Sequence, residues 1–524
     1  MTQIAEVAPG APGMDMDRNG PVALPASVLA GSREGMAEMV ATLAGAIATA
    51  RSAKRRNGPM PPGTPAMVMA AAAESLGPAR WPDRGVGADA ALRRLATMLV
   101  EHGLDLSHPR AAAHLQPPPL AVAVAADALA SAGNASLDTY DSGPSAIAVE
   151  RWLIKGLTAL ARLGDRADGV LTPGGSMSNL LGVLLARDAA AIRRGVDARR
   201  HGVAQLPGPV VFCSELAHFS VHRACAALGL GEQAVRPIPV DERKRMRPDA
   251  LDAMVRGLDG DQTPMAIIAT AGTTDFGSID PLPQLAEIAA EHAIWLHVDA
   301  AYGFGSLFSD RLSGLLAGVE LADSITVDLH KLGWQPAAAS ALLVSDTSAF
   351  TALDRTVAYL NPADDAEAGY DGLLGRSLQT TRRPDAVKVA ATVLAHGRRG
   401  LGQMVDVCHD LAVYAQNRIS REAELELISP AELTTVVFRF RAEGADPDQH
   451  DQINGALRRR LLESGTALIG RTAVRTLGPG SPERVCVKFT LLNPTATPDD
   501  IDDLIDGVLL AGRVSAQRTE EGSA

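Results

Sequence analysis

A lysine at the end of an apolar run is the first candidate for chemistry. The stretch "SITVDLHKLGWQP" has the character of a strand that stops at Asp328 and then presents His330 and Lys331 side by side. A lysine amine in partly apolar surroundings loses pKa and becomes a nucleophile. The alternative is a solvated or ion-paired lysine, which is common at the mouth of a core strand.

An aspartate ends a second apolar run. In "IWLHVDAAYG", Asp299 follows a strand-like stretch, where an ionised carboxylate is costly unless a cation or a strong donor faces it. A helix cap or a salt bridge to a nearby arginine would satisfy the same carboxylate. Asp299 is therefore a candidate partner for a bound cation.

A glycine turn and a histidine complete the set. In "GVLTPGGSMSNLLGVLLAR" a strand stops at Gly174-Gly175-Ser176 and a helix begins. Backbone N–H groups and the positive helix end can hold a phosphate there, although an ordinary strand-to-helix connection has the same pattern. His218 and His222 open a helix in "SELAHFSVHRACAALGLG", where a structural or surface histidine is the simpler interpretation.

Together these groups fit one cofactor, pyridoxal phosphate. Its phosphate would lie at the helix N-terminus, its aldehyde would form a Schiff base with Lys331, and its pyridine nitrogen would stay protonated beside Asp299. A stacked His218 would hold the plane of the ring. The stretch "ATAGTTDFG" adds Thr273 and Thr274 as hydroxyls for the ring or the phosphate.

Strand-length apolar runs separated by helical stretches position these residues. The runs are "GPVVFCS", "MAIIATAG", "IWLHVDAA", "SITVDLH" and "SALLVS". They predict an α/β fold with a mostly parallel sheet covered on both faces, in which ligands bind beyond the carboxyl ends of the strands. Two later strands, "TTVVFRFR" and "RVCVKFTLLNP", flank a helix and predict a smaller C-terminal α+β domain.

Composition and periodicity divide the chain into five parts. We expect a disordered N-terminal segment at residues 1–32, a helical segment at 33–141, a large cofactor-binding domain at 142–397, a small C-terminal domain at 398–515 and a disordered tail at 516–524.

The bulk composition argues against several classes of protein. Lysine and arginine total 49 against 61 aspartates and glutamates, and this formal net charge of −12 disfavours nucleic acid and anionic lipid partners. No apolar run reaches the roughly 18 residues of a membrane-spanning helix, and no secretory signal pattern is seen. Cys213, Cys225, Cys408 and Cys486 lack the close spacing of a metal site. We therefore expect a cytoplasmic protein with reduced thiols and no metal.

The chain resembles the group II pyridoxal-phosphate decarboxylases, and most of all their bacterial L-2,4-diaminobutyrate decarboxylase branch. The resemblance covers residues 108 to 500. It implies fold type I, a homodimer with active sites at the subunit interface, and decarboxylation of an L-amino acid of the diaminobutyrate, lysine or ornithine type. The matching stretches, in the family's order, are "TPGGSMSNLLGVLLAR", "AHFSVHRACAALGLG", "IIATAGTTDFGSIDPL", "WLHVDAAYG", "DSITVDLHKLGWQP", "SLQTTRRPDAVK" and "KFTLLNP".

The resemblance also assigns roles to matching positions. It makes Lys331 the Schiff-base lysine, Asp299 the partner of the pyridinium, and His218 the stacking histidine that touches the substrate carboxylate. The remaining assignments are Ser176, Met177 and Ser178 to the phosphate loop, His330 to the phosphate side, Ala301 to the position under the ring, and Thr274 to the neighbourhood of the cofactor.

Tyr359 is the third predicted catalytic residue. It falls where relatives place a tyrosine on a mobile loop that protonates the substrate carbon after CO2 has left. The surrounding stretch "AYLNPADDAEAGYDG" is acidic and poor in apolar residues, which is typical of a lid. The alternative is a tyrosine that packs a loop against the core.

Departures from the family pattern leave the substrate open. Gly333 and Trp334 stand where relatives often have two phenylalanines, and Ala111, Ala112 and Ala113 stand where larger residues line the substrate mouth. Decarboxylation of an aromatic or acidic amino acid, such as glutamate or aspartate, is therefore an alternative, as is a decarboxylating oxidative deamination. Transamination and aldol cleavage use the same cofactor. A cofactor-binding regulator without turnover is the non-enzymatic alternative.

Overall fold

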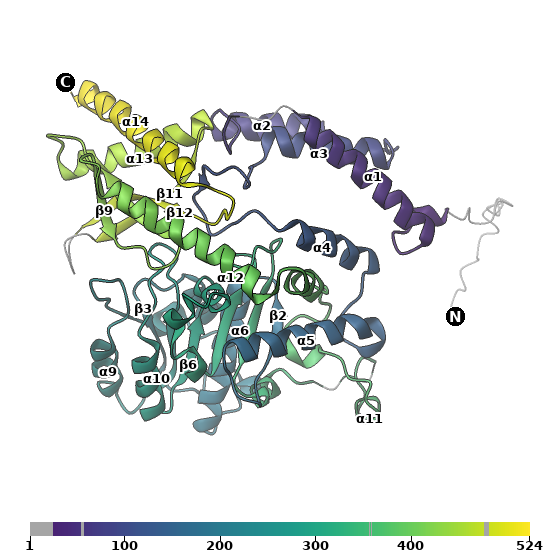
Figure 1. Cartoon of the computed structure of the whole chain (residues 1–524). Helices are drawn as coiled ribbons and strands as arrows, with labels where there is room; N and C mark the ends of the chain where they lie inside the picture. The colour runs from purple at the N-terminus through teal and green to yellow at the C-terminus, as the bar shows by residue number, and fades with distance from the viewer. Residues whose placement is uncertain (1–24, 54–56, 356, 358, 476–481, 524) are drawn as a thin grey trace, which may run out of the picture.

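A computed structural model gives the structure of residues 25–53, 57–355, 357, 359–475 and 482–523. Figure 1 shows a sheet with its covering helices in the lower part of the molecule and the C-terminal elements at the upper left. Three N-terminal helices extend to the upper right.

Seven strands form the large sheet, which confirms the predicted fold class. The order is β2-β8-β7-β6-β5-β3-β4, and all neighbours are parallel except that β8 runs antiparallel to both β2 and β7. The strands are β2 (Asp168–Thr172), β3 (Pro209–Ser214), β4 (Val235–Ile238), β5 (Thr263–Thr270), β6 (Trp295–Asp299), β7 (Ser324–Asp328) and β8 (Ser340–Val344).

Alternation along β6 sends its side chains to two different helical layers. Leu296 and Val298 join the apolar cluster formed with α5, α10 and α12. Trp295, His297 and Asp299 point to the opposite face, where α6 packs across β5, β6, β7 and β8. The helices around this sheet are α5 (Pro144–Leu160), α6 (Gly175–Arg193), α7 (Ala198–His201), α8 (Ser220–Ala227), α9 (Pro248–Arg256), α10 (Leu282–Glu291), α11 (Ala363–Glu367) and α12 (Ala386–Ile419).

The N-terminal part of the chain is mainly helical, with one addition to the prediction. The helices are α1 (Arg33–Ser52), α2 (Pro65–Leu76), α3 (Ala88–His102) and α4 (Ala121–Gly133). The segment 33–141 also contains β1 (Ala111–Ala112), which pairs in parallel with β11. The Leu468 N–H donates to the Arg110 carbonyl, so this short stretch joins the edge of the C-terminal sheet.

The segment predicted to be disordered, residues 1–32, is described only from residue 25 onward. Residues 1–24 lie outside the described residues. Residues 26–28 form a single 3₁₀ turn, and the Ser32 side chain accepts a hydrogen bond from the Gly35 N–H at the start of α1. Ser32 thus caps α1 in the way that short hydroxyl side chains do.

A second sheet forms the C-terminal part of the molecule. Its order is β1-β11-β12-β10-β9, antiparallel apart from the β1–β11 pair. One face packs on α13, α14 and the second half of α12, and the other face contacts Phe276 of the large-sheet region. The predicted boundary between residues 397 and 398 falls within α12, at Gly397, where a φ of 64° interrupts the helix. The elements are β9 (Leu425–Ser429), β10 (Thr435–Phe440), β11 (Leu468–Arg475), β12 (Glu483–Thr490), α13 (Pro447–Ser464) and α14 (Pro498–Ser523).

The predicted disordered tail is instead part of the last helix, which continues to Ser523. Ser515 is buried, its hydroxyl donates to the Ala511 carbonyl, and Ala516 packs against the apolar cluster of the small sheet. Packing of these turns holds the helix, and the polar residues that follow extend it by ordinary propagation. Composition alone missed this support.

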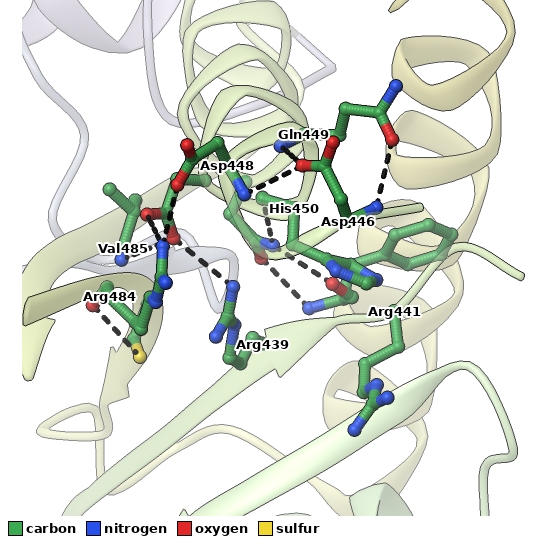
Figure 2. Close-up of polar contacts among 12 residues, drawn as sticks. Arg439, Arg441, Asp446, Asp448, Gln449, His450, Arg484 and Val485 are labelled. Carbon is green, nitrogen blue, oxygen red and sulfur yellow. Dashed lines mark hydrogen bonds and ion pairs between the residues drawn. The ribbon is translucent and has the colours of Figure 1, made fainter. Parts of the chain in front are cut away.

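A charged cluster ties α13 to β10 and β12, and Figure 2 shows it in close-up. Asp451 Oδ1 accepts hydrogen bonds from Arg439 Nη2 at 3.1 Å and from the Val485 N–H at 2.8 Å. Arg484 Nη1 lies 2.8 Å from Asp448 Oδ1 and 3.3 Å from Asp451 Oδ2. We call these five residues the Asp451 cluster. Its positive and negative charges compensate one another within the small domain.

Two further observations concern the apolar length of the helices and the state of the cysteines. Among the described helices, none has both the length and the apolar character needed to cross a lipid bilayer. The four cysteines are free and buried, in agreement with the predicted reduced thiols. Burial raises the pKa of Cys213 to about 12, so this thiol is a packing group and not a nucleophile.

Candidate active site

A cavity of about 460 Å³ lies at the carboxyl ends of β5, β6 and β7, beside the N-terminus of α6. This is the place that the sheet topology predicts for a ligand. Its walls bring together most of the predicted site residues, and add Leu115 from the N-terminal segment. The predicted residues on the walls are Lys331, His330, Asp299, His218, Thr274, Ala301, Ser176 and Met177.

Lys331 extends from the turn that follows β7. Its Nζ lies 2.9 Å from Oδ2 of Asp328, the last residue of that strand. The lysine side chain is 19% exposed, whereas that of Asp328 is 4% exposed. Asp328 Oδ1 also accepts a hydrogen bond from the Ser340 hydroxyl on β8 at 2.5 Å. This fixed carboxylate holds the lysine amine at one point on the cavity wall.

Asp299 ends β6 and is buried. Its Oδ2 accepts a hydrogen bond from Asn179 Nδ2 at 2.8 Å, and its Oδ1 accepts one from the Ala301 N–H at 3.1 Å. Both donors are neutral amides. A carboxylate has about four acceptor positions, so Asp299 keeps acceptor capacity for a cationic group in the cavity. Neither a helix cap nor an arginine salt bridge accounts for Asp299 among the described residues.

His218 lines the cavity with one ring nitrogen already engaged. Its Nδ1 accepts a hydrogen bond from the Ser220 N–H at 3.3 Å and lies 2.8 Å from the Ser220 hydroxyl oxygen. Burial lowers the pKa of His218, an effect that the nearby Asp299 carboxylate opposes. The imidazole is therefore neutral at about pH 7, and its proton resides on Nε2, the nitrogen that remains available to the cavity.

Two glycines allow the turn before α6 to approach β7. Gly174 has a φ of 136°, a conformation that side-chain-bearing residues rarely adopt. A Cβ on Gly175 would lie 2.8 Å from Asp328 Oδ1 and would displace the partner of Lys331. Glycine at these positions thus keeps open the space between the helix N-terminus and the end of β7.

Of the three predicted phosphate-loop residues, the cavity receives two. Ser176 and Met177 line it, and the first N–H groups of an α-helix have no acceptor within the helix. The Ser178 side chain does not reach the cavity. Its hydroxyl is buried 2.7 Å from Thr172 Oγ1, where it joins the first turn of α6 to the end of β2.

The two predicted threonines have different surroundings. Thr274 lines the cavity, as does Ala301. Thr273 is buried, and its hydroxyl lies 2.6 Å from the Ser278 hydroxyl in the turn between β5 and α10. Thr273 therefore stabilises the loop and offers no hydroxyl to the cavity.

His330 lies on the cavity wall next to Lys331. Its Nδ1 lies 3.0 Å from the Ala339 carbonyl oxygen and 3.4 Å from the Ala339 backbone nitrogen, so this side of the ring is held by the backbone of Ala339. Its Nε2 lies 3.7 Å from Asp328 Oδ2. The carboxylate of Asp328 is thus shared between the two neighbouring side chains that the sequence placed side by side.

Tyr359 lies away from this cavity. Its side chain is 84% exposed, and it lines a separate hollow of about 500 Å³ together with Arg187 and Leu360. Within one chain, the structure does not bring Tyr359 to Lys331.

The residues that depart from the family pattern, and that we expected near the substrate mouth, do not line the cavity. Trp334 is fully buried, and its Nε1–H donates to the Leu492 carbonyl at 2.9 Å. A Cβ on Gly333 would lie 2.5 Å from the Leu329 carbonyl oxygen. Neither residue lines the cavity. In the stretch "HPRAAAHLQPPP" it is Leu115, and not the three alanines, that reaches the cavity wall.

Sequence reasoning missed two residues of the site. Asp328 was visible as the end of the strand before Lys331, and three positions separate the two residues, a spacing that places both side chains at one turn. Asn179 lies in the helix after the glycine turn, where a buried amide gives no distinct signal. The one signal in the sequence is that Asn179 is polar although it lies on the helix face that must pack against an apolar sheet.

Comparison with known proteins gives consistent results. The model of the pyridoxal-dependent decarboxylase conserved domain matches residues 77–441. The L-2,4-diaminobutyrate decarboxylase of Rhizobium meliloti (strain 1021) is 40% identical over 428 residues, which are 82% of this chain and 82% of that protein. The enzyme of the same name from Acinetobacter baumannii is 35% identical over 435 residues, or 81% and 84% of the two chains.

A solved structure extends the similarity to three dimensions. It is the glutamate decarboxylase domain of the diaminobutyrate-pyruvate transaminase and L-2,4-diaminobutyrate decarboxylase from Vibrio parahaemolyticus. The TM-score is 0.79 at 31% sequence identity, and the match covers 92% of this chain and 96% of that one.

Proposed function

Because the chain belongs to the pyridoxal-dependent decarboxylase family, we propose that it converts L-2,4-diaminobutyrate to 1,3-diaminopropane and CO2. The chain is a pyridoxal-phosphate-dependent amino-acid decarboxylase, and its substrate is the proposed part. Two relatives with that named activity, each matched over about four fifths of its length, support this choice. One observation carries the proposal: a single cavity is lined by the Lys331 amine, the Asp299 carboxylate and the N-terminus of α6.

The residues around the cavity fit the cofactor. The turn at Gly174 and Gly175 leaves open the space in front of the α6 N-terminus, where an added Cβ on Gly175 would meet Asp328. A helix N-terminus favours an anion such as phosphate. Across the cavity, buried Asp299 has no lysine or arginine paired to it among the described residues, so its carboxylate is available to a cationic group. We therefore assign Ser176 and Met177 to the phosphate end and Asp299 to the ring nitrogen.

The roles of the chain's own residues follow from this arrangement. When bound, pyridoxal phosphate supplies a cationic ring that takes up the electron pair released with CO2. Lys331 offers the amine that attaches to the cofactor aldehyde, and Asp328 holds that amine in place. The Nε2–H of His218 is available to donate a hydrogen bond to a substrate carboxylate. Ala301 is small enough to leave room for a ring beside Asp299.

We assign proton return to Tyr359, acting on the cavity of a second copy of the chain. This assignment requires the homodimer that family resemblance implies, because Tyr359 is exposed and remote from its own Lys331. Exposed apolar side chains on one stripe of α1 support an association of that kind: Met36, Val40, Leu43 and Ile47. A dimer would have twice the chain's mass of 54.6 kDa in a sedimentation measurement. A cytoplasmic location is part of the same proposal.

The experiment is a screen of L-2,4-diaminobutyrate and the common L-amino acids for CO2 release by the purified protein with added pyridoxal phosphate. We expect L-2,4-diaminobutyrate to give the highest kcat/KM, and Lys331→Ala to abolish release. A faster reaction with glutamate, aspartate or an aromatic amino acid would contradict the proposed substrate. Release of CO2 by Lys331→Ala at the native rate would contradict the site.

Product identity separates decarboxylation from its nearest rival. Simple decarboxylation yields the amine without consuming oxygen, whereas a decarboxylating oxidative deamination yields an aldehyde and consumes oxygen. We expect the diamine and no oxygen uptake. Aldehyde as the main product would replace the proposed reaction by the oxidative one.

A further inference from the structure

Asn179 lies at the centre of a buried hydrogen-bond network at the wall of the cavity. It is 1% exposed and lies in the first turns of α6. Its Nδ2 lies 2.8 Å from Asp299 Oδ2 and 2.8 Å from Ser220 Oγ. Its Oδ1 lies 2.7 Å from Thr326 Oγ1 and 3.0 Å from His297 Nε2. The two amide hydrogens and the two acceptor positions of one side chain are thus all engaged.

These contacts permit only one orientation of the Asn179 amide. A carboxylate oxygen can only accept, so the NH2 group must face Asp299. The amide oxygen must then face Thr326 and His297, which both have to donate to it. A flipped amide would place its oxygen 2.8 Å from a carboxylate oxygen with no hydrogen between them.

The protonation of His297 follows from the same constraint. The ring is fully buried, and burial lowers its pKa to about 4, so it is neutral. Its single proton must reside on Nε2, which donates to Asn179. Its Nδ1 must then accept the hydroxyl proton of Ser324, 2.8 Å away. Ser324 in turn accepts from Trp295 Nε1–H, an indole nitrogen that can only donate.

The hydrogen bonds therefore run in one direction and end on Asp299. The order is Trp295, Ser324, His297, Asn179 and Asp299, and each residue donates to the next. Aligned hydrogen bonds polarise one another and favour negative charge at the end that only accepts. We call this line, with its branches at Thr326 and Ser220, the Asn179 network.

The branch at Ser220 reaches the second cavity residue. Ser220 Oγ accepts from Asn179 Nδ2, so its own proton is free to be donated to His218 Nδ1. This donation leaves the His218 proton on Nε2, toward the cavity. One asparagine side chain thus contacts Asp299 directly and His218 through a single hydroxyl.

Packing leaves room for the network at one position on the helix. A Cβ on Gly182 would lie 2.5 Å from Cε1 of His297 and 2.6 Å from Nδ1. Glycine at this position lets the imidazole fit between α6 and β6. Trp295, His297 and Asp299 alternate along β6 on the face toward α6, and Ser324 and Thr326 do so on β7. The side chains of β6 and β7 that form the network therefore all lie on the sheet face that packs against α6.

We propose that Asn179 is the positioning residue that sets both chemical forms the cavity presents, the anionic Asp299 and the Nε2–H form of His218. This inference rests on the proposed function, because it assigns the purpose of Asp299 to the ring nitrogen of the cofactor. Asn179 lines the cavity, but the two hydrogens and the two acceptor positions of its amide are already engaged by protein partners. It therefore acts through Asp299 and His218.

The test uses Asn179→Asp, which keeps the shape and the acceptor oxygen but replaces the NH2 group by a second carboxylate oxygen beside Asp299. Asp299 then shares a proton with its neighbour and loses its full charge. We expect pyridoxal phosphate to bind about tenfold to a hundredfold more weakly. We also expect the ¹⁵N signal of bound [¹⁵N]pyridoxal phosphate to move toward that of a neutral pyridine.

Asn454→Asp is the matched control. Asn454 is equally buried in α13, where its side chain accepts from the Phe440 N–H and donates to the carbonyls of Phe440 and His450. The same substitution there removes the same kind of donor far from the cavity. It is expected to lower the melting temperature and to leave the ¹⁵N signal and the cofactor affinity unchanged.

The outcomes separate this inference from the proposed function. Wild-type protein that fails to bind pyridoxal phosphate would contradict the proposed function. Wild-type protein that binds it, with Asn179→Asp giving the same affinity and the same ¹⁵N signal, would contradict this inference alone. If Asn179→Asp does not fold, Thr326→Val removes one donor to the amide oxygen without changing shape. Thr326→Val is expected to weaken cofactor binding about threefold to tenfold, and unchanged binding would overturn the inference.

Discussion

The Asn179 network and the Asp451 cluster both join a helix to two strands, but they end differently. In the Asn179 network, neutral groups form a line that stops at one carboxylate, and in the part of the chain that the structure describes no charged group is hydrogen-bonded to Asp299. In the Asp451 cluster (Figure 2), Asp451 and Asp448 are balanced by Arg439 and Arg484. The comparison teaches that a buried carboxylate without a cationic side chain beside it, such as Asp299, indicates a ligand site. A set of paired opposite charges, such as the Asp451 cluster, instead stabilises the fold.

The largest expected effect comes from removing the unbalanced charge. Asp299→Asn keeps the size of the side chain but leaves the ring nitrogen without an anion. We expect kcat to fall by a factor that corresponds to about 3–5 kcal/mol, or roughly a hundredfold to several thousandfold. Steady-state kinetics with saturating cofactor measures this. If the kcat of Asp299→Asn stays within a few fold of the wild-type value, the claim that the charge of Asp299 serves the cofactor is wrong.

The second effect comes from breaking the balanced cluster. Asp451→Ala leaves the mostly buried Arg439 without its acceptor and removes the partner of the Val485 N–H. We expect the free energy of unfolding to fall by about 3 kcal/mol. Urea denaturation measures this, with Asp451→Asn as a milder control that keeps one acceptor. The affinity for pyridoxal phosphate should not change, and a large loss of affinity would mean that the two clusters are not independent.

The smallest expected effect is a difference in pH dependence. Burial lowers the pKa of His297 from 6.5 to about 4. Between these two pH values the unfolded state binds a proton on this imidazole and the folded state does not. Stability from this residue is therefore complete above about pH 6.5 and is lost as the pH falls toward 4, by at most about 3 kcal/mol. His297→Gln lacks this contribution, so its unfolding free energy should decline less steeply in that window.

Urea denaturation of wild type and His297→Gln at several pH values isolates this contribution, because the titration of the carboxylates is common to both proteins. The Asp299 carboxylate, which opposes the lowering of the His297 pKa, is also present in both. Parallel curves across the window would show that His297 is already protonated in the folded protein. The direction assigned to its hydrogen bonds would then be wrong.

Much of the fold was predictable because its strands have strong local signals. Continuous apolar runs gave β3, β5, β6, β7 and β8, and the glycine turn before α6 marked the loop near the cavity. What could not be predicted depends on contacts between distant segments. The short β1 forms because Ala111 pairs with Leu468, whose N–H donates to the Arg110 carbonyl. The last turns of α14 persist because Ser515 is buried and Ala516 packs against the apolar cluster of the small sheet.

The residues of the site also fall into those that the sequence identifies and those that depend on contacts between distant segments. Lys331, Asp299 and His218 were predictable because each carries a distinctive group at the end of a strand or the start of a helix. The Ser178 side chain lies against Thr172, since a helix turns successive residues in different directions and only some of them face the cavity. Asn179 could not be recognised, because its importance comes from four partners on three other elements.

The most direct measurement is borohydride reduction of the purified protein in the presence of pyridoxal phosphate, followed by mass spectrometry of the proteolytic peptides. The account predicts that the peptide containing Lys331 gains the mass of one reduced pyridoxyl phosphate group and that no other lysine is labelled. An unlabelled Lys331 peptide, or a label on Lys388 or Lys488 instead, would contradict it.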